Sequence, residues 1–463
     1  MSRYTAATDS DRAEMLAAIG VESIDELFAR QVPAALRLKQ PLDLPAPMGE
    51  QEVFAHLLEL ASRNTSAQDE LTFAGGGMYD HYVPAIVDML MSRSEFLTPY
   101  TPYQPEVSQG TLQVMFEYQT AISELTGLPI SNASVYEGPS AVASAGYLAR
   151  LANKRAKCVV SAGLMDHSLQ TLRTYAHGYG AEIVEVPLTD GVTDPGAWAQ
   201  AIDADTAAAF VQQPNFLGAV EDVAALAAAA HQHGGEECVV VGAYDPIVLG
   251  ILAAPGECGV DVCVGEGQAL GNRLDFGGPS FGFFAATERH LRQMPGRIAG
   301  ETTDVDGKRG FVLTLQTREQ HIRREKATSN ICTAQALNAL GAMVYLAWLG
   351  RDGLVELGEL LLQRTHYARE SLCAIDGVSA RHEQPVIREF ALRLDVGGAA
   401  ARDEVLDRCR DAGVNPGVAL EDDALLVAIT EQRSRADIDR LADVLGAAVA
   451  AVRSARVGEA AHA

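Results

Sequence analysis

Short apolar segments alternate with helical patterns through the middle of the chain, and this alternation constrains the fold more than any other feature. Strands are expected at residues 158–161, 183–186, 207–212, 238–243, 260–264 and 281–285. Helices are expected between or before them, at residues 111–126, 139–152, 167–179, 195–202 and 222–232. Strands that alternate with helices build βαβ units, whose strands run parallel in a sheet covered on both faces. The middle of the chain therefore predicts a doubly wound, mostly parallel α/β domain.

The two flanking regions have different patterns. Near the N-terminus, helical patterns at residues 12–20 and 50–63 are separated by prolines, which is typical of an arm that lies on another surface. Beyond residue 350, predicted helices and strands alternate at 353–373, 388–394, 402–412, 424–429 and 435–452. We therefore predict an N-terminal helical arm (1–74), a large α/β domain (75–350) and a small C-terminal α+β domain (351–463).

Charge and cysteine content exclude several classes of protein. The 463 residues include 61 acidic and 36 basic side chains, and a net charge of −25 argues against sequence-independent nucleic-acid binding. The most apolar stretch, residues 337–349, is shorter than the roughly 20 residues needed to span a membrane. The seven cysteines are scattered without disulfide or metal-site spacing. We expect a soluble, cytoplasmic protein that binds no metal, nucleic acid or membrane.

Four positions at predicted strand ends and helix starts follow the order found in a pyridoxal-phosphate site. Such a site needs a helix N-terminus for the phosphate, a planar side chain on the ring, an aspartate for the pyridine nitrogen and a lysine for the Schiff base. Ser140 and His167 lie at helix starts, and Asp245 follows a strand. The fourth position, after the next strand, is Gln268.

Gln268 cannot form a Schiff base, because an amide nitrogen is not nucleophilic. Lysine is scarce in the whole chain, and none of the five lysines lies at the expected strand end: Lys39, Lys154, Lys157, Lys308 and Lys326. The sequence therefore predicts a degenerate site without its covalent anchor. Asp245 is then better interpreted as a structural aspartate with a buried hydrogen bond, and His167 as a helix-packing residue.

Several long, unusual strings resemble the P protein of the glycine cleavage system, over essentially the whole chain. They are residues 100–110 (YTPYQPEVSQG), 128–134, 213–218 (QPNFLG), 277–279 (GGP) and 324–337 (REKATSNICTAQAL). The match is closest to the smaller, N-terminal-half chain of the two-subunit form. In that family the catalytic half carries a histidine–lysine pair nine residues before Gly-Gly-Pro, and the non-catalytic half carries glutamine. Gln268 stands nine positions before Gly277.

The resemblance implies the aminotransferase-type fold of pyridoxal-phosphate enzymes and a non-catalytic subunit that is inactive alone. It further implies a lysine-bearing partner subunit, in an α2β2 assembly, that holds pyridoxal phosphate, decarboxylates glycine and passes the aminomethyl group to the lipoyl arm of the H protein. Two alternatives stay open. One is an autonomous pyridoxal-phosphate decarboxylase that uses Lys308 or Lys326, and the other is a non-enzymatic scaffold of the same fold.

Two strings contain the candidates for contact with a partner's active site. Residues 75–105 are rich in glycine, tyrosine and proline and are expected to be irregular. In and just after this region, Tyr100, Tyr103, Gln104, Glu106 and Gln109 suit a subunit interface. The second string offers Arg324, Thr328, Ser329 and Asn330. It either holds a partner's anionic group or caps the following helix, and the sequence leaves both open.

Overall fold

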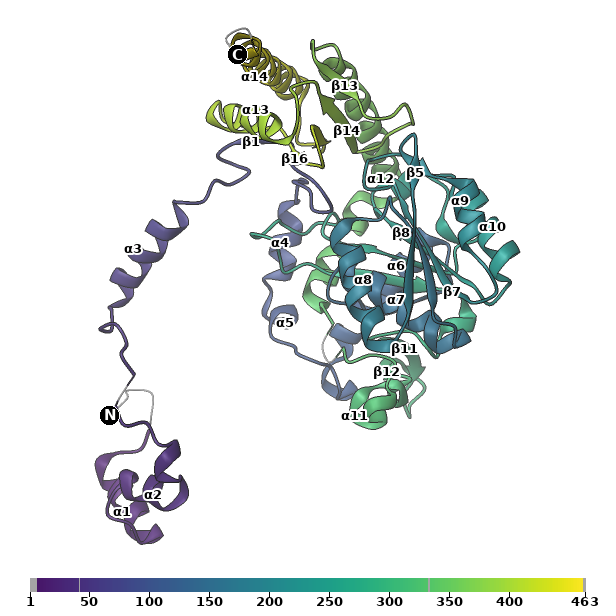
Figure 1. Ribbon diagram of the computed structural model, residues 1–463. Helices are drawn as coiled ribbons and strands as arrows, with labels where there is room; N and C mark the ends of the chain where they lie inside the picture. Colours follow the sequence, from purple (N-terminus) through teal and green to yellow (C-terminus); the bar gives the residue numbers. More distant parts are fainter. Residues whose placement is uncertain (1–5, 41, 332–333, 461–463) are drawn as a thin grey trace. The chain divides into compact units, whose positions relative to one another are not determined.

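The computed structural model describes residues 6–40, 42–331 and 334–460. The chain divides after Thr65 into two compact units, which are described separately (Figure 1). The first unit contains helices α1 (Asp9–Ile19), α2 (Ile24–Gln31) and α3 (Glu50–Ala61), and a short 3-10 helix, η1 (Ala34–Leu36). Val21 is its only buried residue among those described, so its helices have no core of their own.

The second unit is built on a seven-stranded sheet with strand order β2-β10-β9-β8-β7-β3-β4. The strands are β2 (Ile130–Ser131), β3 (Lys157–Ser161), β4 (Glu182–Val186), β7 (Thr206–Gln213), β8 (Val239–Tyr244), β9 (Val262–Glu266) and β10 (Gly282–Ala286). Strands β4, β3, β7, β8 and β9 are parallel, and β10 and β2 join antiparallel at one edge. The predicted doubly wound, mostly parallel α/β fold is therefore confirmed.

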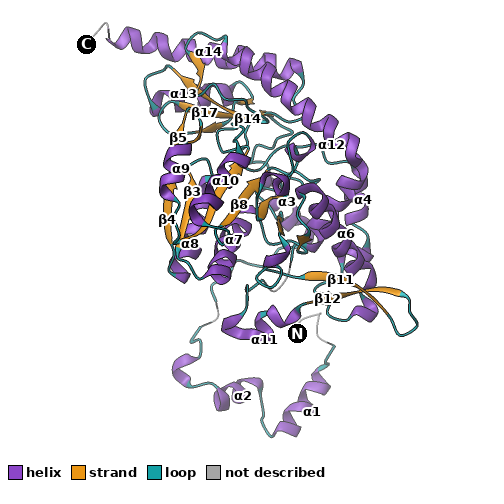
Figure 2. Ribbon diagram, turned by 90° about the vertical axis from the view of Figure 1, so that its right-hand side faces the viewer, coloured by secondary structure: helices purple, strands orange, loops and turns teal. Residues whose placement is uncertain are grey.

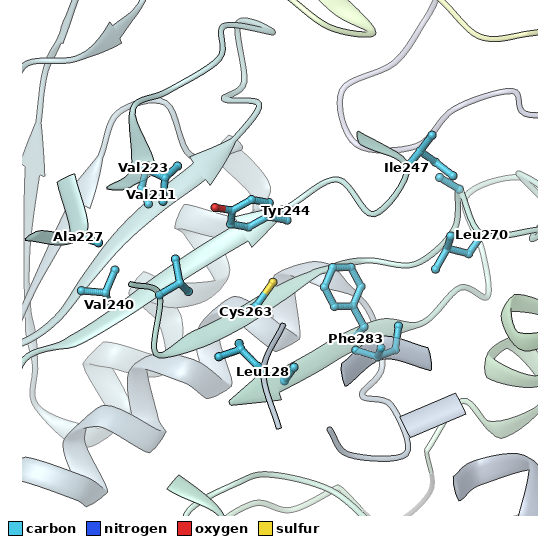
Figure 3. Close-up of a cluster of buried hydrophobic side chains, with 14 of the residues drawn as sticks. Leu128, Val211, Val223, Ala227, Val240, Tyr244, Ile247, Cys263, Leu270 and Phe283 are labelled. Carbon is cyan, nitrogen blue, oxygen red and sulfur yellow. The ribbon is translucent and has the colours of Figure 1, made fainter. Parts of the chain in front are cut away.

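Helices cover both faces of this sheet, which is why its strands are apolar along their whole length. Helices α7 (Gly138–Asn153) and α8 (Asp166–Tyr179) lie on one face, and α9 (Pro195–Ala201) and α10 (Val223–Gly234) on the other (Figure 1). Successive residues of β8 alternate between the two cores: Val239 and Val241 belong to one and Val240 to the other. Figure 3 shows the core that contains Val240, which lies near Ala227 of α10.

A long helix, α12 (Ala336–Cys373), leads from the large sheet to a smaller one (Figure 2). It is kinked at Gly350 (φ 63°), where the sequence predicts a change of domain. The smaller sheet is antiparallel, with the order β13 (Val378–Ala380), β14 (Glu389–Leu394), β17 (Ala424–Ala428) and β16 (Val418–Ala419). Together with α13 (Ala399–Asp411) and α14 (Arg435–Ala460) it forms a separate hydrophobic core.

Three features differ from the sequence-based expectation. Residues 75–105 are not wholly irregular, because α4 (Ala85–Met91) and α5 (Ser94–Leu97) form between their prolines. Strand β1 (Leu71–Thr72) pairs in parallel with β15 (Val414–Asn415), so residues just before 75 belong to the second unit. A hairpin of β11 (Ile298–Thr303) and β12 (Arg309–Thr314) was not predicted.

The remaining elements are short, apart from α6. They are α6 (Gln109–Thr126), α11 (Gln320–Arg323), β5 (Leu188–Thr189), β6 (Val192–Thr193), η2 (Pro105–Val107), η3 (Val248–Gly250), η4 (Pro255–Cys258), η5 (Glu288–His290), η6 (Gln316–Arg318) and η7 (Arg324–Lys326). No helix in the described part of the chain is both long enough and apolar enough to cross a membrane. The six described cysteines carry free thiols.

Candidate functional site

A cavity of about 60 Å³ lies where the parallel strands of the large sheet end. Open α/β sheets bind ligands at this edge, because the loops that follow the strands leave a crevice there. The structure places His167, from the start of α8, and Asp245, directly after β8, in the cavity wall. Gln268 does not line the cavity: it is buried (1% exposed) and bonds to Tyr79, which does. Ser140 does not line this cavity and faces a second one instead.

Asp245 is paired with a cation from the small domain. Its Oδ2 atom lies 2.9 Å from Nε of Arg388, whose side chain is 1% exposed. The guanidinium carbon of Arg388 also lies 4.1 Å from the centroid of the Tyr79 ring, a cation–π contact. The second oxygen of Asp245, Oδ1, accepts a hydrogen bond from the backbone N–H of Ile247 (2.9 Å). Both oxygens of this carboxylate are therefore engaged within the chain.

The backbone at Arg388 is itself unusual, with φ at 68°. This left-handed conformation costs free energy for a residue with a side chain, so neighbouring contacts must stabilise it. The backbone N–H of Arg388 donates to Oγ1 of Thr365 (3.1 Å), and its carbonyl accepts from the N–H of Ile429 (2.7 Å). These bonds hold the guanidinium at the cavity.

Gln268 uses both ends of its amide group. Its Oε1 accepts from the backbone N–H of Tyr79 (2.9 Å), and its Nε2 donates to the carbonyl oxygens of Tyr79 (3.0 Å) and Asn272 (2.8 Å). A lysine could not replace it in this role, because an ammonium group has three donors and no acceptor. Gln268 therefore holds the segment around Tyr79 in place.

The N-terminus of α7 is occupied by a carboxylate. Oε2 of Glu266, the last residue of β9, accepts from the backbone N–H of Gly138 (2.9 Å), the first residue of α7. Its Oε1 accepts from the N–H of Gln268 (3.1 Å) and from the hydroxyl of Ser280. Helix N-termini attract anions, because they present free N–H groups and a positive dipole end. Burial raises the pKa of Glu266 above its ordinary value.

A second buried carboxylate connects the small domain to the segment around Tyr79. Oε1 of Glu389 accepts from the backbone N–H of Gly76 (2.6 Å), and its Oε2 accepts from the hydroxyl of Tyr79 (2.7 Å). Burial raises the pKa of Glu389 to about 7. The segment packs closely here: a Cβ atom on Gly75 would overlap the Glu389 carboxylate, and one on Gly77 would lie 3.2 Å from the ring of His167.

Among the described residues no lysine lines the cavity. Lys154 donates to the carbonyl of Leu151 (2.6 Å) at the end of α7. Lys157 pairs with Asp203 (2.6 Å). Lys308 lies between the strands of the β11–β12 hairpin, and Lys326 ends the exposed 3-10 helix η7. Lys39 lies in the first unit.

These side chains do not fit pyridoxal phosphate. The cofactor requires an amine where the chain has Gln268, and free backbone N–H groups where Glu266 already accepts. It also requires an unpaired carboxylate for its ring nitrogen, and Asp245 is paired with Arg388. The site has the position of a cofactor pocket, but its carboxylates are already engaged within the chain, and Nη1 and Nη2 of the buried Arg388 guanidinium have no hydrogen-bond partner among the described residues.

A second, larger cavity of about 440 Å³ lies between α7, α8 and residues 320–331. Its wall contains several of the sequence-predicted residues together: Ser140, Arg324, Thr328, Ser329 and Asn330. Arg324 and Asn330 are exposed, and the buried hydroxyl of Tyr179 in the same wall has no hydrogen-bond partner among the described residues. This cavity therefore combines a cation with hydroxyl and amide groups. Cys332 and Thr333, which end the predicted string, lie outside the described residues.

The alternative that this string caps the following helix is wrong. Helix α12 begins at Ala336, with Gln335 at its N-cap and no side-chain capping bond. The hydroxyls of Thr328 and Ser329 bond elsewhere: Oγ1 of Thr328 donates to the carbonyl of Met294 (3.3 Å), and Oγ of Ser329 accepts from the N–H of Gly296 (3.2 Å). They are therefore used to hold the string against residues 294–296.

The two predicted interface strings both contact residues 296–297, since Ser329 of the second string bonds to Gly296 and Tyr103 of the first bonds to Arg297. The hydroxyl of Tyr103 accepts from Nη2 of Arg297 (2.6 Å), and its ring lies 6.1 Å from that of His321. Tyr100, Gln104 and Glu106 are exposed, with Tyr100 at 75%.

Gln109 has a different environment, because its amide accepts from the N–H of Phe311 (2.8 Å) and donates to its carbonyl (2.9 Å). Gln109 therefore ties α6 to the β11–β12 hairpin.

Sequence reasoning missed four residues that shape the first cavity: Tyr79, Glu266, Arg388 and Glu389. Glu266 lies between two glycines directly after a predicted strand, and a carboxylate there was a signal that went unused. The Gly75–Gly77 run was the signal for a tightly packed segment. Arg388 and Glu389 gave no signal, because nothing local shows that the small domain folds back onto Asp245.

A doubly wound large domain, a small α+β domain and a pocket at the strand ends define a chain with the fold of pyridoxal-phosphate enzymes. Residues 2–445 match the model of the family described as glycine cleavage system P-protein. The chain belongs to the glycine cleavage system P-protein family and is a subunit of that family's enzyme.

Its relatives match along nearly their whole length. A protein of Moorella thermoacetica named probable glycine dehydrogenase (decarboxylating) subunit 1 is 48% identical over 440 residues, covering 95% of this chain and 98% of the relative. One of the same name from Prosthecochloris aestuarii is 46% identical over 445 residues, covering 96% and 99%.

Solved structures agree with the fold. A crystal structure of glycine decarboxylase (P-protein) of the glycine cleavage system, in inhibitor-bound form, superposes with a TM-score of 0.88 at 41% identity, covering 96% of this chain and all of that one. A glutamate decarboxylase of Lactobacillus brevis superposes at 0.69 with 15% identity, covering 91% and 97%, and shows the fold alone.

Proposed function

We propose that this chain is the non-catalytic subunit of a two-chain glycine decarboxylase, and that a separate lysine-bearing chain holds the pyridoxal phosphate. The observation that carries the proposal is Gln268, which stands at the Schiff-base position and is fully used in hydrogen bonds to the chain's own backbone. Relatives named subunit 1, which match over nearly their whole length, support a role as one of two chains.

The partner's cofactor supplies the decarboxylation of glycine, and the aminomethyl group passes to the lipoyl arm of the H protein. This chain's contribution is structural: it provides surfaces that complete and enclose the partner's site. We infer an α2β2 assembly in the cytoplasm. The free thiols of the six described cysteines support a reducing compartment.

Two surfaces are proposed for the partner. The first is the exposed string with Tyr100, Gln104 and Glu106, in which prolines restrict the backbone and aromatic and amide groups face outward. Aromatic side chains are enriched at protein interfaces, and a rigid backbone loses less entropy on binding. Neighbouring Val107 is 79% exposed, which adds apolar area to the same string.

The second surface is the rim of the larger cavity, where we propose that Arg324, Thr328, Ser329 and Asn330 face an anionic group of the partner's site. Thr328 and Ser329 are held in place by residues 294–296, while the Arg324 side chain is exposed. Arginine suits phosphate and carboxylate groups, because its guanidinium donates two parallel hydrogen bonds.

Co-purification and an activity assay test the proposal. The chain is co-expressed with a lysine-bearing P-protein chain, and glycine decarboxylation is measured by carbon exchange with bicarbonate in the presence of lipoylated H protein. We expect activity from the two chains together and none from this chain alone. Activity of the isolated chain would favour the autonomous decarboxylase, and failure of the two chains to co-purify would favour the scaffold.

A further inference from the structure

We propose that Glu266 and Arg388 make the first cavity self-occupied: they take the places of the cofactor's phosphate and ring nitrogen, so that restoring the lysine alone would not restore cofactor binding. This inference deepens the proposed function, since it rests on the assignment of the cofactor to the partner. It differs from that assignment in naming residues of this chain that exclude the cofactor.

The first step concerns the start of α7. A phosphate at this position would need the N–H groups of the first helical turn, and the N–H of Gly138 already donates to Oε2 of Glu266 (2.9 Å). The hydroxyl of Ser280 and the N–H of Gln268 hold the other oxygen of Glu266. A bound phosphate would have to displace the bond from Gly138, and it would lie beside a carboxylate of the same sign that two further hydrogen bonds hold in place.

The second step concerns Asp245. A protonated ring nitrogen binds an aspartate as a cation, and this aspartate already has one, because Nε of Arg388 lies 2.9 Å from its Oδ2 atom. The guanidinium stacks on Tyr79, with 4.1 Å between its carbon and the ring centroid, and its side chain is 1% exposed. A planar cation therefore occupies the position that a planar, protonated ring would need.

The third step concerns the closure of the cavity. Gln268 binds both backbone groups of Tyr79, and Glu389 binds the N–H of Gly76 and the hydroxyl of Tyr79. Arg388 and Glu389 come from the small domain, while Gln268 and Asp245 come from the large one. The same contacts that fill the cavity therefore also join the two domains, which gives them a positive structural role.

The experiment measures non-covalent binding to the full-length chain without its partner. The probe is 4′-deoxypyridoxine 5′-phosphate, which has the ring and the phosphate of the cofactor but no aldehyde, so it needs no lysine. Binding is measured by equilibrium dialysis for the wild type, for Glu266→Gln/Arg388→Gln and for the control Glu185→Gln/Arg273→Gln. The control makes the same two changes in exposed ion pairs.

We expect no binding to the wild type or the control at millimolar probe. The Glu266→Gln/Arg388→Gln variant should bind the probe with a dissociation constant at least about tenfold below that of the control, a difference of roughly 1.4 kcal/mol. Binding of the probe to the wild type would overturn the proposal. So would a variant with wild-type circular dichroism that binds no more tightly than the control.

A second variant keeps the test decisive if the first does not fold. Gln268→Lys leaves both occupying groups in place, so a Gln268→Lys chain with wild-type circular dichroism, incubated with pyridoxal phosphate and borohydride, should carry no label at position 268. Label at that position would refute self-occupation. Label at Lys308 or Lys326 would instead contradict the proposed function, so the two failures are distinguishable.

Discussion

The buried ion pair between Asp245 and Arg388 gives the sharpest prediction about stability. The change Asp245→Asn keeps the shape of the side chain and the acceptor for the N–H of Ile247, but it leaves the guanidinium without its counter-charge. Removing one partner of a buried pair costs about 3–5 kcal/mol of unfolding free energy. Asp245 is 12% exposed, and the guanidinium keeps its contact with Tyr79, so we expect the lower end, about 3 kcal/mol.

The assay is urea unfolding of the full-length chain, followed by circular dichroism and tryptophan fluorescence. The matched control is Asp88→Asn, which breaks an exposed pair with Arg273 in which both side chains are about half exposed (53% and 50%). Exposed pairs contribute about 0–1 kcal/mol, so the control should be close to the wild type. The double variant Asp245→Asn/Arg388→Met should be more stable than Asp245→Asn alone, because it removes the unpaired charge.

The reasoning would be refuted if Asp245→Asn cost no more than Asp88→Asn, or if removing Arg388 as well made the protein less stable still. Either result would mean that water reaches the guanidinium and that the cavity is open.

Three further predictions concern neighbouring features. Gly218→Ala should prevent stable folding, because the new Cβ would overlap the carbonyl oxygen of Glu389. The control Gly180→Ala is also at positive φ, but its new Cβ would point into open space, so it should lower the unfolding free energy by only about 1–2 kcal/mol, measured by thermal unfolding. Glu389→Gln should gain stability relative to the wild type as pH rises from 4.5 to 7. Between pH 4.5 and 7 the Glu389 carboxyl of the wild type holds its proton in the folded state but not in the unfolded state. The unfolding free energy of the wild type, measured with urea, should therefore fall by up to about 1.4 kcal/mol per pH unit. A stability difference between the two proteins that does not change with pH would contradict this. Gln109→Ala should speed hydrogen exchange of the N–H of Phe311, measured by NMR or mass spectrometry, and unchanged exchange would argue against its role in holding the hairpin.

Most of the sheet could be predicted, because short apolar runs such as Val239–Tyr244, separated by helical patterns, permit few other folds. The β11–β12 hairpin was missed although Asp306-Gly307 is a recognisable hairpin turn signal. Its strands are polar on one side. In the sequence they follow the last strand of the large sheet, where the alternation of strands and helices has ended. The helix α4 was missed because the surrounding prolines dominate the local pattern, yet Pro84 directly precedes the helix rather than interrupting it.

The site was only partly predictable. The strand before position 268 shows where a Schiff-base lysine would be expected, and the sequence has glutamine there. The ion pair at Asp245 did not follow from the sequence, since Arg388 reaches Asp245 only after the small domain has folded against the large one. Local patterns contain no information about such contacts. The two interface strings were found as candidates, and their shared contact with residues 296–297 was not, for the same reason.

The central claim is that the cofactor is held by the partner and not by this chain, and one measurement tests it directly. The two-chain complex is loaded with pyridoxal phosphate, reduced with borohydride, digested and mapped by mass spectrometry. We expect a phosphopyridoxyl label on one lysine of the partner and on no lysine of this chain. A stoichiometric label on Lys308, Lys326 or any other lysine of this chain would contradict it.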